Sequence, residues 1–84
     1  MSEPVTLYFD RDGALGIGAT VPVTCVPLCV GDEGELERLM GEHAHYLDDR
    51  ETPMIPGLLW AEGRDAALEA IAQFRILMLA ELAS

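Results

Sequence analysis

The sequence predicts a small α+β domain, in which an antiparallel sheet of three to four strands is covered by two helices. Three observations predict this class. The first third of the chain is rich in β-forming residues, two later segments carry apolar residues at helical spacing, and clusters of Gly, Pro and Asp separate these segments. The 84 residues are expected to form a single domain over 1–84, because a chain this short has room for one modest core.

The sheet is expected from the N-terminal third of the chain. A run of Val, Thr, Leu, Tyr and Phe predicts a first strand at about 4–9, and the turn Asp10-Arg11-Asp12-Gly13 joins it to a second strand at about 14–20. The glycines of this second strand permit a bulge or a close approach of another segment. A third strand is expected at about 23–30. Its two prolines favour a sheet edge, with a break near Pro22.

Two helices are expected to follow. The first is predicted at about 33–48, with Asp32 as its N-cap and several glutamates in its first turn, where the helix dipole favours anions. The second is predicted at about 64–82, because apolar residues recur there at spacings of three and four. The segment 58–61 between the helices is apolar and allows a short fourth strand.

The second helix is nearly apolar all round from Phe74 onward, and a helix of that kind needs more than one surface to pack against. We therefore expect a homodimer as one option, with packing wholly within one chain as the other. The residues expected on the dimer face are Phe74, Ile76, Leu79 and Leu82.

The stretch FDRDGALGIG, residues 9–18, begins like a calcium loop and also resembles a nucleotide-binding loop. A calcium loop starting at Asp10 needs Gly at its sixth position and Glu at its twelfth, where this chain has Leu15 and Val21. A nucleotide loop must lead from a strand into a helix, whereas a further strand is expected here. The stretch is therefore interpreted as a hairpin turn. Whether its tip lies beside the acidic segment 32–51 is left open.

The residue types that carry most metal and nucleophile chemistry are few. Cys25 and Cys29 would lie about 13 Å apart in an extended strand, too far for a disulfide, and are expected to be free thiols. His43 and His45 are two apart on a predicted helix and so point in different directions, and both serines lie at the termini. We therefore expect no metal, no cofactor, no catalytic residue and no enzyme activity. A small metal-binding or cysteine-dependent enzyme remains the third alternative.

The distribution of negative charge is the most informative feature. Fifteen acids against five bases give a net charge of −10, which disfavours nucleic acid and anionic membranes and favours basic partners. The acids concentrate in residues 32–51, and Tyr46 and Trp60 could serve as apolar anchors beside them. The acidic face expected to bind a partner comprises Glu35, Glu37, Glu42, Asp48, Asp49 and Glu51. The alternative is a solvated surface that only aids solubility.

These features lead to the hypothesis of a small inhibitor or adaptor that masks the basic, nucleic-acid-binding surface of a partner enzyme or complex. Phage-encoded inhibitors of host defence nucleases, including anti-CRISPR proteins, share this size and charge; the analogy is not one of sequence. The alternative is a structural or assembly subunit that forms a homodimer through the C-terminal helix. The N-terminus MSEPVTLYFD lacks a basic segment followed by an apolar one, and no apolar run is long enough to cross a membrane, so we expect a cytoplasmic protein.

Overall fold

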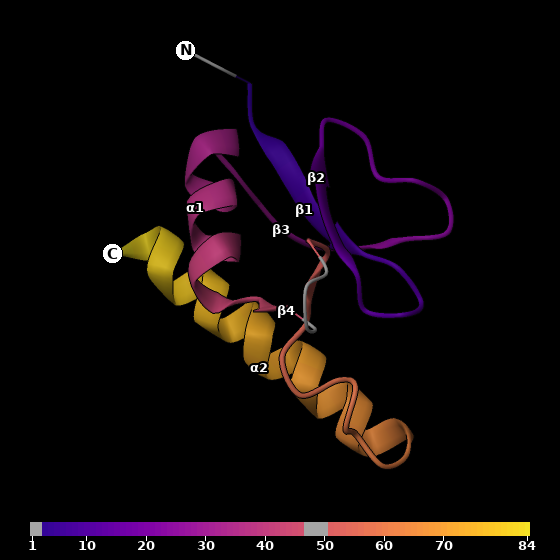
Figure 1. The fold of residues 1–84 in the computed structure, drawn as a ribbon. Coiled ribbons are helices and arrows are strands. Elements are labelled where there is room, and N and C mark those ends of the chain that lie inside the picture. Colours follow the sequence, from indigo (N-terminus) through magenta and orange to yellow (C-terminus); the bar gives the residue numbers. More distant parts are fainter. Residues whose placement is uncertain (1–2, 47–50) are drawn as a thin grey trace.

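The computed structural model, which describes residues 3–46 and 51–84, confirms the α+β class (Figure 1). The principal sheet is antiparallel with strand order β2-β1-β3, and a separate two-stranded sheet pairs β4 with β5. In chain order the elements are β1 (Val5–Phe9), β2 (Leu15–Gly18), β3 (Val26–Gly31), α1 (Glu33–His43), β4 (His45–Tyr46), β5 (Pro53–Met54) and α2 (Arg64–Ala83).

The molecule has two layers, because the helices cover one face of the sheet. Burial alternates along β1: Val5, Leu7 and Phe9 point into the core, whereas the residues between them are half-buried. Buried residues of both helices, Leu36 and Leu39 of α1 and Phe74 and Met78 of α2, belong to the same core cluster as these strand residues. The side chains below 2% exposure are Leu7, Leu36, Leu39, Ile55 and Met78, which come from the sheet, both helices and the loop between them. The core therefore depends on every layer of the fold.

The first hairpin has the geometry that its glycines were expected to allow. Gly13 closes the turn at φ +87°, in the left-handed region that favours glycine. Tyr8 lies over Gly16 of the neighbouring strand so closely that a Cβ atom on Gly16 would sit 2.6 Å from the Tyr8 ring. The glycines of β2 therefore make space for the Tyr8 ring on the neighbouring strand. This packing explains the glycine-rich sequence without a nucleotide-binding role.

The third strand is shorter than predicted and lies at the edge of the sheet, as its prolines indicated. The chain makes a turn over 22–25, in which the Cys25 N–H donates to the Pro22 carbonyl, so the strand begins at Val26 rather than at about 23. A bulge shifts the register between Leu7 and Tyr8 of β1. As a result, Leu28 and Cys29 are both buried although they are consecutive.

The first helix ends earlier than predicted, at His43 instead of about 48. Ala44 has extended backbone angles, and His45 and Tyr46 then pair as β4 with Met54 and Pro53. Thr52 precedes Pro53, and the residue before a proline favours extended backbone. This preference suits the pairing of β5 with β4. Of the predicted acidic face, Glu35, Glu37 and Glu42 lie on α1. Asp48 and Asp49 lie outside the described residues.

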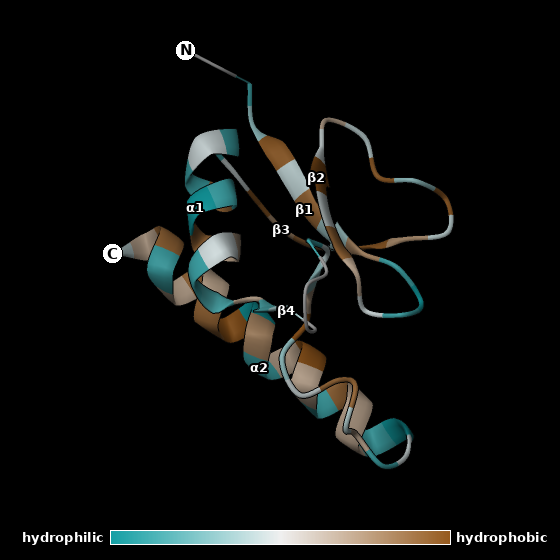
Figure 2. Ribbon diagram, viewed as in Figure 1, coloured by the Kyte–Doolittle hydropathy of each residue, from teal (hydrophilic) through white to brown (hydrophobic). Residues whose placement is uncertain are grey.

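The short fourth strand allowed at 58–61 is not formed; the chain makes consecutive turns there instead. Gly57 adopts φ +83°, the Leu58 N–H donates to the Ile55 carbonyl, and the Ala61 N–H donates to the Leu58 carbonyl. These local hydrogen bonds occupy backbone groups that a strand would need for pairing. The second helix is close to its prediction, at Arg64–Ala83, and remains largely apolar beyond its first turn (Figure 2).

Candidate functional site

Acidic side chains gather at the N-terminal end of α1. The Asp32 side chain caps the helix by accepting a hydrogen bond from the Glu35 N–H at 3.3 Å, as its position predicted. Glu33 and Glu37 are exposed and Glu35 is half-buried. No base occurs within residues 32–37, so four acids lie within six residues without an intervening base. We refer to Asp32, Glu33, Glu35 and Glu37 as the acidic first turns.

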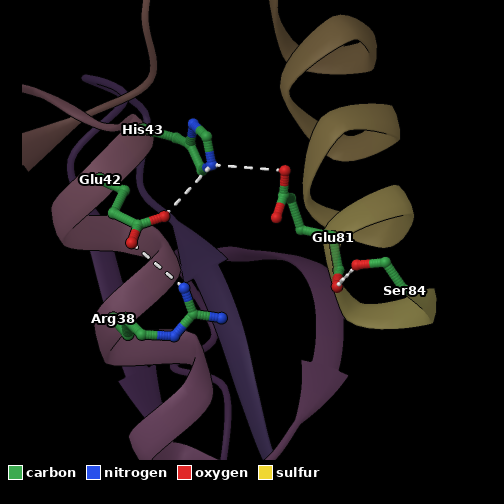
Figure 3. A network of polar contacts seen from close by, with 5 residues as sticks. All are labelled: Arg38, Glu42, His43, Glu81 and Ser84. Carbon is green, nitrogen blue, oxygen red and sulfur yellow. Dashed lines mark hydrogen bonds and ion pairs between the residues drawn. The ribbon is translucent and has the colours of Figure 1, made fainter.

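The acids farther along α1 are tied to cationic or polar neighbours (Figure 3). Arg38 Nη1 lies 3.1 Å from Glu42 Oε1, and His43 Nε2 lies 3.8 Å from Glu42 Oε2 and 3.9 Å from Glu81 Oε1 of α2. The His43 Nε2 atom is buried and makes no hydrogen bond with the described residues. Glu42 is therefore engaged by two residues of its own helix, and His43 is the residue that reaches Glu81 of α2.

Glu51 is the remaining predicted acid that the structure describes, since Asp48 and Asp49 lie outside the described residues. Glu51 is exposed and lies in the segment that leads to β5, not on α1. That segment borders the first hairpin, since Ala14 forms a β-bridge with Met54 and the Ile55 N–H donates to the Gly13 carbonyl at 3.0 Å. The hairpin tip itself points away from α1 (Figure 1). The question raised by FDRDGALGIG is thus answered: its carboxylates lie apart from the acidic first turns.

The two aromatic residues proposed as anchors are both exposed, Trp60 at 63% and Tyr46 at 40%. The Trp60 ring makes an edge-on contact with His45, with ring centroids 4.9 Å apart and an interplanar angle of 74°. Tyr46 and Trp60 therefore lie beyond the C-terminal end of α1, and the acidic first turns lie at the other end. Six residues of α1, 38–43, follow the acidic first turns, so about 9 Å of helix lies between them and the helix end.

The predicted dimer face divides into exposed and covered residues. Ile76 and Leu79 are exposed at 66% and 48%, respectively. Phe74 is buried at 3%, and Leu82 packs against the core, so neither is available for a contact between chains. Leu68, which the sequence placed on the inner stripe, is 52% exposed. The exposed apolar stripe of α2 consists of Leu68, Ala72, Ile76, Leu79 and Ala83, at spacings of three and four.

Arg75 holds α2 to the sheet edge, a role that sequence reasoning missed. Its Nε donates to the Leu28 carbonyl at 3.2 Å and its Nη2 to the Pro27 carbonyl at 3.1 Å. A lone arginine within the apolar stretch from Phe74 to Ala80 was the signal that could have revealed it. Burial raises the pKa of the neighbouring Cys29 thiol, and the positive charge of Arg75 partly opposes this rise.

The two cysteines are free, Cys29 buried and Cys25 half-buried. In the described ranges, 3–46 and 51–84, no group of three or more His, Cys, Asp or Glu side chains is arranged to hold a metal ion. Among those same residues, neither helix is long and apolar enough to cross a membrane.

Comparisons with known proteins assign no family: no family model matches the sequence, and no curated protein and no solved structure matches the chain significantly.

Proposed function

We propose that this chain is a small cytoplasmic binding protein that acts without catalysis, by covering a basic surface of a partner protein. The observation that carries the proposal is the set of four acids in the acidic first turns, on a chain with a net charge of −10. A basic nucleic-acid-binding surface is the partner surface that such charge complements best, because both sides would form charge-assisted contacts. The partner would then lose access to nucleic acid.

Tyr46 and Trp60 could contribute to the same interface. They lie beyond the end of α1, about 9 Å of helix after the acidic first turns, and a typical protein interface covers about 800 Å² per partner. One partner can therefore contact both groups. Exposed ion pairs contribute about 0.2–1 kcal/mol each, so the aromatic anchors would supply much of the affinity and the acids the charge selectivity.

The test is affinity capture from cells of the source organism at low and high salt, followed by identification of the captured proteins. We expect basic nucleic-acid-binding proteins to be retained at low salt and released at high salt. A triple variant should weaken capture at low salt: Glu33→Gln, Glu35→Gln and Glu37→Gln. A matched triple variant, which removes the same charge from exposed positions elsewhere, should retain it: Glu3→Gln, Glu62→Gln and Glu69→Gln.

The matched variant separates a defined face from overall charge. Equal loss of capture in both triple variants would show that only net charge matters. Capture of acidic or uncharged partners that resists high salt would refute the proposal.

A structural subunit that forms a homodimer is the second candidate, favoured by the exposed apolar stripe of α2. Ile76 and Leu79 are large apolar side chains with no covering element among the described residues. Light scattering should then give the mass of two chains at high micromolar concentration. The double variant Ile76→Gln with Leu79→Gln should give the mass of one. A single-chain mass for the unaltered protein would eliminate this candidate.

A further inference from the structure

An open hollow of about 500 Å³ lies between the first hairpin turn and the N-terminal half of α2, and no residue of α1 lines it. Its walls come from β1 and its turn, the start of β3, the turns after β5 and α2. This volume falls within the range of protein sites that accept a small molecule or one large side chain.

The floor of the hollow is apolar. Phe9 is buried, and Leu58 and Ile71 are partly buried and pack against the core. At the rim Val26 is 48% exposed and Leu59 is 55% exposed. Exposed apolar side chains that surround a hollow provide contact area for another molecule.

The mouth of the hollow is charged by the hairpin turn. Asp10 Oδ1 accepts hydrogen bonds from the Asp12 N–H at 2.9 Å and the Ala14 N–H at 3.0 Å, so this carboxylate fixes the turn. Asp12 and Arg11 are exposed, and no ion pair within the described ranges involves either. Two carboxylates and one guanidinium leave a net charge of −1 at the mouth, and the Asp12 carboxylate is open to a ligand.

We propose that this hollow binds an arginine side chain of a partner protein, flanked in that partner by an apolar residue. The aliphatic stem of the arginine lies on Phe9, Leu58 and Ile71, as long charged side chains do on apolar surfaces. Its guanidinium reaches the Asp12 carboxylate, with which arginine can form two parallel hydrogen bonds. The apolar neighbour rests on the rim formed by Val26 and Leu59.

Charge complementarity favours this occupant over a neutral one, because the whole chain carries −10 and the mouth itself is negative. A neutral apolar side chain would satisfy the floor and leave the Asp12 carboxylate without a partner. The site goes beyond the proposed function, since it lies apart from the acidic first turns and does not use them.

Two matched peptides test the site by NMR titration of the labelled protein: acetyl-Leu-Arg-Leu-amide and the same peptide with citrulline in place of arginine. Citrulline has nearly the same shape as arginine but no charge. We expect amide shifts at Asp12, Thr24, Leu59 and Ile71, and about fivefold tighter binding of the arginine peptide at low salt. Equal affinity of the two peptides, or shifts centred on α1, would overturn the proposal.

Neighbouring substitutions in the turn should act in opposite directions. Asp12→Asn should abolish the preference for arginine, and Arg11→Gln should strengthen binding of the arginine peptide several-fold, because it removes a like charge. Controls with the same charge changes on exposed positions outside the hollow are Glu69→Gln and Arg64→Gln. Control effects as large as those of the turn variants would show attraction to net charge and refute the site. The acidic-first-turns triple variant should bind the peptide normally, which separates this site from the proposed function.

Discussion

Gly41 and Gly63 make a matched pair in which the same substitution should have opposite effects. A Cβ atom built on either residue meets no atom within 4 Å, so neither site resists an added methyl group by contact. Gly41 lies in α1, where alanine is favoured over glycine by about 0.5–1 kcal/mol. Gly63 precedes α2 with φ 94° and ψ 169°, a conformation essentially restricted to glycine, where alanine costs about 1–3 kcal/mol.

The expected change in melting temperature follows from the chain length. An unfolding entropy of about 2.1 cal/mol/K per residue gives about 180 cal/mol/K for 84 residues. Gly41→Ala should therefore raise Tm by about 3–6 °C, and Gly63→Ala should lower it by about 6–17 °C.

Thermal and urea unfolding followed by far-UV circular dichroism measure both variants against the unaltered protein. The double variant should show the sum of the two effects, because the residues share no neighbours. A decrease in Tm for Gly41→Ala would mean that α1 does not continue through residue 41 as described. An unchanged Tm for Gly63→Ala would mean that its backbone is not in the left-handed half of conformational space.

Three further predictions concern stability. Asp32→Ala removes the N-cap of α1 and should reduce the free energy of unfolding by about 1 kcal/mol in urea titrations, whereas Asp32→Asn should restore most of it. Arg75→Met keeps the apolar stem but loses both hydrogen bonds to carbonyl groups, so the free energy of unfolding should decrease by about 1–3 kcal/mol. A larger decrease for Arg75→Ala would measure the additional contribution of the stem. Since burial raises the pKa of Cys29 above 9.0, the unfolded chain ionises this thiol at lower pH than the native chain does. The free energy of unfolding should therefore fall as pH rises above about 9 through the native pKa. In the Cys29→Ala variant, the free energy of unfolding should fall less steeply over the same pH range.

The elements that depend on local pattern were predictable from the sequence. The hairpin follows from Asp12-Gly13 between two β-forming runs, and α2 from its apolar spacing over five turns. The length of α1 was not predictable in this way, because acidic and polar residues after His43 are compatible with either helix or loop. What ends the helix is the pairing of β4 with β5, a contact with residues further along the chain.

For the candidate site, too, local features were predictable from the sequence, whereas contacts between distant residues were not. The sequence locates the acids and places Arg38 four residues before Glu42, a spacing that favours an ion pair within one helix. It does not show that His43 approaches Glu81, since that contact forms only once the two helices have packed. Exposure of Leu68 and Trp60 likewise depends on which side of each element meets the core. The hollow beside the first hairpin joins residues from four separate segments, and no local sequence pattern predicts that these segments come together.

The contact of Arg75 with β3 limits the pairing of this edge strand with another molecule. An edge strand with open backbone groups invites a strand of another molecule to pair with it. In β3, Pro27 has no N–H to offer, and the carbonyls of Pro27 and Leu28 are already held by the Arg75 guanidinium. Through Arg75, α2 thus covers the open edge of the sheet at β3. Any event that moves α2 away would also expose this edge to β-pairing with another molecule.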